Sequence, residues 1–576
     1  MKDFSQLKKN LKKDFTLLKS IKVAVLGDSA TQFLAQALRG AGYDEGLDLQ
    51  IFEADFNQIG RQVLDPNSDL YAFQPDIVLL FQATHKLLGK FNKLELAQQS
   101  QMATNELEHA STLYQTLQSH MNAKVLYYNY TEIDDAVFGN FANKTENSFL
   151  FQLRKLNYLL MDFATNNGNF HLVDLSSIQN QIGKANFFQP AIYINSEMVL
   201  SLDALPLVAS KTVALINTLE GKFKKCVILD LDNTTWGGII GDDGLEHIQI
   251  GSLGIGKAFT EFQYWIKKLK NRGVIVAVCS KNTESIAKEP FEKHPDMVLR
   301  LEDISVFKAN WDNKVSNIQE IQSLLNIGFD SMVFLDDNPF ERAIVRENIP
   351  EITVPELPED PANYLEYLYG LNLFETVSFS EEDLVRTQLY QTEALRKSTF
   401  EKFTSEEDFL KSLNMISVIS KFDSFNIPRV AQLSQRSNQF NLRTIRYSES
   451  EIEKLAQSED YFTFAFTLED QFGDNGWIAV VILKKQDAKT LFIDTWFMSC
   501  RVLKRGMEAF VLNFIMDVAK ENGIQTVVGE YLPTLKNELV QNHYENLGFT
   551  KEADLWHLDV ETFFPQPTYI SQHFKN

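Results

Sequence analysis

Cysteine is scarce in this sequence. Its 576 residues contain three cysteines, Cys226, Cys279 and Cys500. Three thiols cannot form the disulfide framework that small secreted proteins use. The scarcity is typical of chains that fold in a reducing compartment, so we expect free thiols and a cytoplasmic location.

Long apolar runs and an excess of positive charge are missing too. No stretch approaches the ~20 apolar residues that a membrane helix needs, and MKDFSQLKKNLKKDFTLLKS at the start lacks the uninterrupted apolar core of a secretion signal. Lys and Arg number 55 against 77 Asp and Glu, which gives a net charge of −22. An acidic chain is repelled by nucleic acid and by anionic membranes, so we expect neither as a partner.

The hydrophobic pattern predicts a multidomain α/β protein. Apolar runs alternate with helical periodicity in two successive regions, which is typical of doubly wound parallel sheets. From about residue 400 the pattern changes to an antiparallel α+β arrangement. We divide the chain into an N-terminal helix (1–20), a first domain (21–221), a second domain (222–361), a helical linker (362–400) and a third domain (401–576).

Individual strands follow from buried apolar runs. In the first domain we expect strands at 21–27, 75–81, 123–130 and 170–175. In the second we expect them at 225–231, 274–280, 297–301 and 332–337. The third domain is predicted to be a meander followed by a helix at 504–522 and a strand at 526–532.

Two strands of the second domain run into aspartates. The stretch VILDLDNTTWGGIIGDDG (227–244) places Asp230 and Asp232 one residue apart, and Asp336 and Asp337 end another predicted strand. Residues i and i+2 of an extended chain point to the same side. Carboxylates at the carboxyl ends of neighbouring parallel strands repel one another unless a cation lies between them. Mg²⁺ prefers oxygen ligands and bridges to phosphate, so all four aspartates are candidate ligands.

The order D-x-D-x-T, strand-end serine, lysine and D-D resembles the haloacid dehalogenase (HAD) superfamily of phosphohydrolases, which has a Rossmannoid fold. The resemblance implies that Asp230 is a nucleophile that forms an aspartyl-phosphate and that Asp232 is the general acid and base. It also implies that three further residues hold the phosphoryl group: Thr234, Ser280 and Lys314, with Lys308 as an alternative for the lysine.

More specific motifs resemble the FkbH-like branch of that superfamily. They are WGG (236–238), CSKN (279–282), NWDNK (310–314), FLDDNPFER (334–342), FETVSFSEEDLVRTQLY (374–390) and QRSNQFNLRTIRY (435–447). The branch implies that the protein removes the phosphates of 1,3-bisphosphoglycerate and passes the glyceryl unit to the thiol of a separate acyl carrier protein. Cys279 adjoins Ser280 and is a candidate acyl-accepting thiol. A packed core cysteine is the alternative.

The sequence is also compatible with two other functions. One is a phosphatase for a sugar or polyol phosphate in polysaccharide synthesis, with an acyltransferase domain. The other is a non-catalytic scaffold. The phosphatase would act on free sugar phosphates, whereas the transferase needs a carrier protein.

The first domain resembles SGNH esterases at GDSATQFLAQAL (27–38), where Ser29 follows a strand and precedes a helix. Such an enzyme needs Asp-x-x-His near its end. Here Asp174 is followed by Ser177 where the histidine would stand. We therefore expect Ser29 to cap the helix or to contact a ligand in a domain without hydrolase activity. His85 is a candidate base, but we favour a structural role for it.

The third domain resembles GNAT acyltransferases at CRVLKRGMEAFVLNFIM (500–516). Backbone amides at such a strand-to-helix loop grip a pyrophosphate. The resemblance implies a site for coenzyme A or a carrier's phosphopantetheine arm, with Arg501, Lys504 and Gly506 in the loop and Tyr544 as proton donor. Lys504 stands where this loop usually has a glycine.

Overall fold

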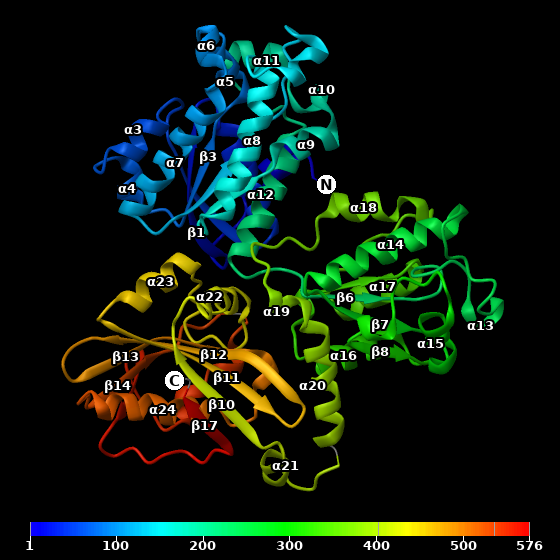
Figure 1. The fold of residues 1–576 in the computed structure, drawn as a ribbon, viewed down its shortest axis with the longest axis vertical. Helices are drawn as coiled ribbons and strands as arrows, with labels where there is room; N and C mark the ends of the chain where they lie inside the picture. The colour runs from blue at the N-terminus through cyan, green and yellow to red at the C-terminus, as the bar shows by residue number, and fades with distance from the viewer. Residues whose placement is uncertain (1, 401, 535, 575–576) are drawn as a thin grey trace. The chain divides into compact units, whose positions relative to one another are not determined.

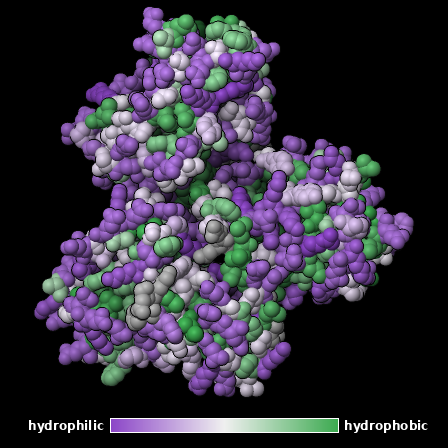
Figure 2. All heavy atoms as spheres, viewed as in Figure 1, coloured by the Kyte–Doolittle hydropathy of each residue, from purple (hydrophilic) through white to green (hydrophobic). Residues whose placement is uncertain are grey.

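The structure, a computed structural model, describes residues 2–400, 402–534 and 536–574. It divides into two compact units, Met1–Asn217 and Thr218–Asn576, each of which is described by itself. Among the described helices, none combines the length and the apolar character that crossing a membrane requires. The face drawn in Figure 2 is mostly hydrophilic, with apolar residues scattered between the polar ones.

The first unit is built on a five-stranded parallel sheet with the order β2-β1-β3-β4-β5 (Figure 1). Its strands are β1 (Lys19–Gly27), β2 (Leu47–Glu53), β3 (Ile77–Phe81), β4 (Lys124–Tyr128) and β5 (Phe170–Val173). The sheet is doubly wound, as predicted, and its strand order is flavodoxin-like. The sequence missed β2, because this edge strand alternates apolar and polar residues instead of forming an apolar run.

Helices cover both faces of this sheet. They are α1 (Phe4–Asn10), α2 (Gln32–Asp44), α3 (Ile59–Leu64), α4 (Asp69–Phe73), α5 (Thr84–Phe91), α6 (Leu96–Gln99), α7 (Met102–His120), α8 (Phe149–Thr165), α9 (Leu175–Ile182), α10 (Lys184–Phe187), α11 (Pro190–Ser196) and α12 (Leu205–Leu219). The predicted N-terminal helix is shorter than expected. It is a seven-residue helix with a capping box at Asp3, and residue 19 already belongs to β1.

The second unit begins with a four-stranded parallel sheet of order β8-β7-β6-β9. Its strands are β6 (Cys226–Leu229), β7 (Ile275–Ser280), β8 (Val306–Ala309) and β9 (Met332–Leu335). Alternate residues of β6 enter two different apolar clusters, with Val227 and Leu229 in one and Cys226 and Ile228 in the other. A strand buried on both faces reads as a continuous apolar run, which is why the sequence located it.

One predicted strand of this sheet was wrong. Residues 297–300 are not a strand, and Leu301–Asp303 form a 3-10 turn. The outer strand is β8 instead. Its sequence is VFKA, in which the two middle residues are only half buried. Too few apolar residues stand together there for the pattern to mark a strand.

The remaining helices of the second unit surround this sheet, connect it to the third region or pack on the last sheet. They are α13 (Ile240–Asp243), α14 (Gly254–Asn271), α15 (Glu284–Lys293), α16 (Lys314–Leu325), α17 (Pro339–Asn348), α18 (Tyr364–Leu371), α19 (Glu381–Leu384), α20 (Arg386–Phe400), α21 (Glu406–Ser412), α22 (Ile427–Arg436), α23 (Glu449–Gln457), α24 (Met507–Glu521) and α25 (His543–Asn546).

The third region is an eight-stranded sheet with α24 packed on one face (Figure 1). The strand order is β15-β16-β14-β13-β12-β11-β10-β17. The strands are β10 (Met415–Lys421), β11 (Tyr461–Asp470), β12 (Gly473–Lys485), β13 (Thr490–Met498), β14 (Thr526–Glu530), β15 (Thr550–Glu552), β16 (Leu555–Asp559) and β17 (Ile570–Phe574). The predicted meander is present in β10 to β13. However, β13 pairs with β14 in parallel, as does β10 with β17.

Candidate active site

Three of the predicted aspartates meet at one edge of the second unit's parallel sheet. One carboxylate oxygen from each of Asp230, Asp336 and Asp337 lies within 4.8 Å of the others. The strands explain this meeting, because β6 and β9 are parallel neighbours with Leu229 opposite Leu335. Each strand ends one residue before its aspartate. The group therefore has the oxygen donors that Mg²⁺ prefers.

Lys314, the first residue of α16, lies among these carboxylates. Its Nζ is 2.9 Å from Asp230 Oδ1 and 2.5 Å from Asp336 Oδ2. Burial opposes the charge of the ammonium, but the two aspartates outweigh burial and raise the pKa of Lys314 above its ordinary value. The alternative, Lys308, forms an ion pair with Glu320 at the surface. Lys314 is therefore the lysine of this site.

The ammonium of Lys314 does not fully compensate the negative charge of the clustered carboxylates. Burial, and then the charge of Asp230, raise the pKa of Asp336 to about 7 despite the nearby ammonium. The same two causes raise the pKa of Asp337. Carboxylates in this condition are stabilised by a further cation, and a divalent ion matches both the charge and the oxygen donors.

Asp232 lies outside this carboxylate group, contrary to the expectation that its side chain would share a side with Asp230. The extended chain ends at β6, and Asn233 adopts a left-handed conformation with φ 54°. The Asp232 carboxylate instead accepts hydrogen bonds from the Trp236 indole (3.0 Å), the Ile240 amide (3.0 Å) and the Asn282 side chain (2.8 Å). Burial raises its pKa. Its side chain is thus held beside the three metal-binding candidates and is not one of them.

The Trp-Gly-Gly motif builds the loop that holds Asp232. Trp236 is fully buried. Gly237 exchanges two backbone hydrogen bonds with Gln249, and a Cβ on it would lie 2.8 Å from the Phe259 ring. Gly238 has φ 91°, which a side chain would strain. Burial, close packing and backbone conformation therefore explain why the three positions hold tryptophan, glycine and glycine.

The two predicted phosphate-binding hydroxyls are at the same edge of the sheet. The buried Thr234 hydroxyl accepts a hydrogen bond from the Asp337 amide at 2.9 Å and lies 3.3 Å from the Asp337 carboxylate. It therefore orients the loop of Asp337. Ser280 is the last residue of β7, the neighbour of β6, and is almost fully buried.

The structure decides between the two interpretations of Cys279 in favour of a core residue. Its side chain has no exposed surface, and it belongs to the apolar cluster that contains Cys226 and Ile318. Its Sγ lies 3.8 Å from the backbone oxygen of Lys314. Burial raises the pKa of the thiol, so the reactive thiolate is disfavoured. The prediction of an acyl-accepting thiol at this position is not supported.

Arg342 is a residue of the site that the sequence reasoning missed. It lies on α17 and is almost fully buried. Its Nη1 donates hydrogen bonds to the backbone oxygens of Asp336 (2.8 Å) and Asp337 (2.6 Å). It thereby fixes the backbone that carries two of the carboxylates. Arg342 is the one arginine of the FLDDNPFER motif, but the sequence does not indicate that its side chain turns back toward the aspartates.

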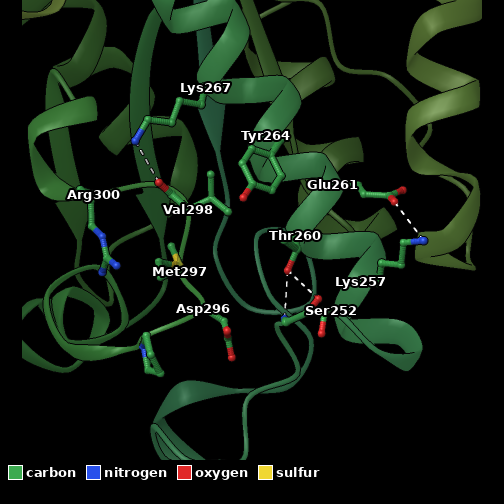
Figure 3. Close-up of a pocket in the computed structure, with 12 residues that line it drawn as sticks. Ser252, Lys257, Thr260, Glu261, Tyr264, Lys267, Asp296, Met297, Val298 and Arg300 are labelled. Carbon is green, nitrogen blue, oxygen red and sulfur yellow. Dashed lines mark hydrogen bonds and ion pairs between the residues drawn. The ribbon is translucent and has the colours of Figure 1, made fainter.

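A separate cavity of about 680 Å³ lies beside α14 (Figure 3). It is lined by residues of α14, by Gly251 and Ser252, and by residues between 295 and 300, and none of the clustered carboxylates lines it. Its polar groups are largely engaged within the chain. Lys267 donates to the Val298 backbone oxygen at 3.1 Å, and the Thr260 hydroxyl bonds with the Gly251 backbone. Arg300 donates to two backbone oxygens. We assign this cavity no role in the chemistry.

The predicted coenzyme loop has the expected backbone form. Gly506 is the residue before α24 and has φ 77°. Lys504 adopts φ 63°, the conformation that a glycine would favour there. Lys504 and Arg501 line a cavity of about 540 Å³.

Contacts within the chain are made at this loop and beside β13. The Glu508 carboxylate accepts hydrogen bonds from the backbone amides of Lys504 and of Glu508 itself. The segment 440–442 lies along β13, where the Leu442 amide donates to the Trp496 oxygen (3.2 Å) and its oxygen accepts from the Leu532 amide (2.9 Å).

Tyr544, the predicted proton donor, is also closed off. It is 1% exposed, and its ring packs so tightly on β14 that a Cβ on Gly529 would lie 2.3 Å from it. The predicted site residues Arg501 and Tyr544 therefore do not share one cavity.

Ser29 of the first unit is not a helix cap. The N-cap of α2 is Thr31, and Ser29 is fully buried. His85 stacks on Phe188, with ring centroids 3.9 Å apart, in keeping with the structural role expected for it.

Comparisons with known proteins gave a family model and a solved structure of high identity. A family model described as FkbH, N-terminal domain, matches residues 22–217. A solved structure from Bacteroides fragilis, the N-terminal part of the protein BF1531 containing a phosphatase domain complexed with Mg, is 54% identical. The match covers 66% of this chain and 100% of that chain, with a TM-score of 0.64. No curated protein matches.

Two acetyltransferase structures also match, at much lower similarity. The ribosomal-protein-S18-alanine N-acetyltransferase of Escherichia coli is 17% identical over 26% of this chain and 99% of that chain, with a TM-score of 0.21. The GNAT domain of PAT from S. lividans is 17% identical over 24% of this chain and 89% of that chain, with a TM-score of 0.20. The high identity to the Bacteroides structure, together with the family model, shows that the chain belongs to the FkbH-like family of the HAD superfamily.

Proposed function

We propose that the chain is a Mg²⁺-dependent phosphatase and glyceryl transferase. It would dephosphorylate 1,3-bisphosphoglycerate and deliver the glyceryl unit to the thiol of a separate acyl carrier protein in the cytoplasm. The observation that carries the proposal is the group of Asp230, Asp336 and Asp337 around the ammonium of Lys314. The Bacteroides relative, which was solved with Mg, supports the choice of metal.

The same three carboxylates would hold the metal ion. Their oxygens are close enough to share one ion, and their raised pKa values at Asp336 and Asp337 indicate that they need more positive charge. A bound Mg²⁺ supplies charge stabilisation for the phosphoryl oxygens. Lys314 adds a fixed positive charge at the same place.

The phosphatase step uses two aspartates in different roles. A carboxylate oxygen of Asp230 attacks phosphorus, the bond between phosphorus and the ester oxygen breaks, and the leaving alkoxide takes a proton from Asp232. Water then attacks the aspartyl-phosphate, with Asp232 as the base. The raised pKa of Asp232 suits a group that must carry a proton in the first step.

The acyl step needs a thiol, and we propose that the carrier supplies it. Cys279 is a core residue. The carrier's thiolate would attack the carbonyl carbon of the acyl phosphate, the carbon–oxygen bond to the phosphate would break, and inorganic phosphate would leave.

The second candidate is a phosphatase for sugar or polyol phosphates whose third domain acylates the product. Tyr544 is 1% exposed, so it is not accessible as a proton donor, which counts against acylation from coenzyme A. A third candidate, a scaffold without catalysis, would have no need for the carboxylates around Lys314.

One experiment separates these candidates. Purified protein with Mg²⁺, 1,3-bisphosphoglycerate and a phosphopantetheinylated carrier protein should add a glyceryl unit to the carrier, measured by intact mass, and release phosphate. Asp230→Asn should abolish phosphate release from the ester. Asp242→Asn, the same change at an exposed aspartate, should not. Phosphate release from sugar phosphates without any mass shift on the carrier would favour the second candidate. Unchanged activity in Asp230→Asn would refute phosphatase catalysis at this site.

A further inference from the structure

A cavity of about 400 Å³ in the first unit lies at a place where parallel α/β sheets bind ligands. The strand order β2-β1-β3-β4-β5 reverses direction between β1 and β3. Asp28 directly follows β1 and Gln82 directly follows β3, and both line the cavity. The carboxyl ends of the two strands at the reversal point thus form its floor. Neither residue has a role in the phosphatase site.

The floor offers one acceptor and one donor to a ligand. Asp28 Oδ1 accepts a hydrogen bond from the Ala83 amide at 2.9 Å, which fixes the carboxyl group and leaves its second oxygen. The Gln82 side-chain oxygen accepts from the Tyr127 hydroxyl (2.5 Å) and the Tyr130 hydroxyl (3.3 Å). Because its oxygen is held by two buried tyrosines, Gln82 has its amide nitrogen left as a donor. A carboxylate beside an amide N–H₂ suits the hydroxyl groups of a ligand.

The other residues that line the cavity differ in chemistry from those of its floor. His85 and Tyr193 line one wall, with ring centroids 4.9 Å apart, and burial lowers the pKa of His85 to about 4, so this wall is uncharged near neutral pH. Lys86, Lys90 and Lys93 line the cavity as well.

Two of these lysines are already in ion pairs. Lys86 pairs with Glu197 at 2.7 Å and Lys90 with Glu106 at 3.3 Å. Both pairs are partly exposed, so each contributes little free energy and can be exchanged for a ligand's anionic group. Three lysines at one cavity contrast with the net charge of −22 of the chain.

The cavity has no nucleophile of the esterase kind. Ser29, whose position after β1 suggested one, has no exposed surface, and it is not among the residues that line the cavity as described. A ligand would therefore be bound here and not cleaved by a serine.

We propose that this cavity is a second ligand site, independent of the phosphatase site, for a small hydroxylated anion. Asp28 and Gln82 bind the hydroxyl groups, and Lys90 and Lys93 bind the phosphate or carboxylate group. A hydroxylated phosphate and a hydroxylated carboxylate share this chemistry, and the test below distinguishes them. The site lies within one compact unit and needs no contribution from the rest of the chain.

The test is calorimetric titration of the full chain carrying Asp230→Asn, in EDTA, so that phosphatase turnover and metal-dependent binding are removed. The probes are 3-phosphoglycerate, glucose 6-phosphate and citrate, with inorganic phosphate and glycerol as single-feature controls. We expect at least one of the three hydroxylated anions to bind, about ten-fold or more tightly than either control, because two or more charge-assisted hydrogen bonds are added. A preference for the phosphates or for citrate identifies the anionic group.

Variants locate the binding. Asp28→Asn and Lys93→Ala should each weaken it by about ten-fold, the loss of one charge-assisted hydrogen bond, whereas Lys9→Ala, an exposed lysine of α1, should not change it. Thermal unfolding of each variant checks that the unit is folded. Absence of saturable binding for all three probes would overturn the proposal, and so would binding that survives both Asp28→Asn and Lys93→Ala. The result does not depend on the phosphatase proposal, because the protein in this assay carries Asp230→Asn and has no phosphatase turnover.

Discussion

Replacement of Arg342 by methionine should weaken Mg²⁺ binding although Arg342 cannot itself be a metal ligand. The methionine side chain ends near the position of the arginine Nε and has no donors. The backbone oxygens of Asp336 and Asp337 would lose hydrogen bonds of 2.8 and 2.6 Å. Each buried carbonyl left without a partner costs about 1–3 kcal/mol. The backbone carrying two carboxylates would shift to find water, and the carboxylates would shift with it.

The expected size follows from the kind of contact. Loss of a group that orients metal ligands typically costs about 10–100-fold in metal affinity. The Mg²⁺ concentration for half-maximal phosphatase activity should rise by this factor in Arg342→Met, while kcat at saturating Mg²⁺ falls less. Arg342→Lys, which keeps the charge and can donate to one of the oxygens, should lie between wild type and Arg342→Met.

Arg346 provides the matched control. It lies one turn further along α17. Both arginines form an ion pair with Glu356, and Arg346 also donates to a backbone oxygen, that of Val354. Arg346→Met therefore removes the same charge from the same helix without touching Asp336 or Asp337. Its Mg²⁺ dependence should match wild type. An equal shift in the two variants, or no shift in Arg342→Met, would refute the reasoning.

Three further outcomes follow from the geometry. Lys314→Met should lower phosphatase activity by about 100-fold or more, the usual effect of removing a charge that stabilises the transition state, whereas Lys308→Met should leave it unchanged; the opposite pattern in a phosphate-release assay would reassign the lysine. Cys279→Ala should keep glyceryl transfer while lowering the unfolding free energy by ~1–2 kcal/mol, since a small buried group is lost; loss of transfer in a fully stable variant would restore a catalytic thiol. Burial lowers the pKa of His543 from 6.5 to about 3, so the unfolded chain binds more protons between these values, and stability is full above about pH 6.5 and is lost as pH falls. At about pH 5 the loss is about 2 kcal/mol; urea unfolding of His543→Gln should show a weaker pH dependence, and an unchanged dependence would contradict this.

The parallel sheets could be predicted from sequence because their central strands are buried on both faces. Such strands, like β6, have no polar position to interrupt the apolar run. The edge strands β2 and β8 were missed, since half-exposed strands mix polar residues into short apolar stretches. The edge strands β5 and β9 were predicted, so position in the sheet alone did not decide which strands the pattern detected.

In the candidate site, too, some features were predictable from the sequence and others were not. Asp230, Asp336 and Asp337 were predictable because strand ends of parallel neighbours must lie together. The orientation of Asp232 was not predictable, because it depends on a left-handed Asn233 and on a donor, Asn282, fifty residues later. The sequence likewise could not decide whether Cys279 faces the site or the core, since both faces of β7 are buried.

Two FkbH-like motifs outside the carboxylate group also have a structural explanation. Asp383, in one motif, is buried and forms ion pairs with Arg386 of the same motif and Arg436 of the other. Breaking a buried pair costs much more than forming it gains. These arginines are therefore constrained by one aspartate, and their place in the motifs does not require a role in the chemistry.

The charges of the site explain why it needs both Lys314 and a metal. The three clustered carboxylates carry three negative charges, which one ammonium and one divalent ion together balance. A neutral site accepts a phosphate that carries two negative charges, whereas the same site without the metal would repel it. Asp232 is hydrogen bonded outside this group, so its charge is not needed in the balance and it is free to carry a proton. Asp230 and Asp232 thus have different surroundings, although only Leu231 separates them in the sequence.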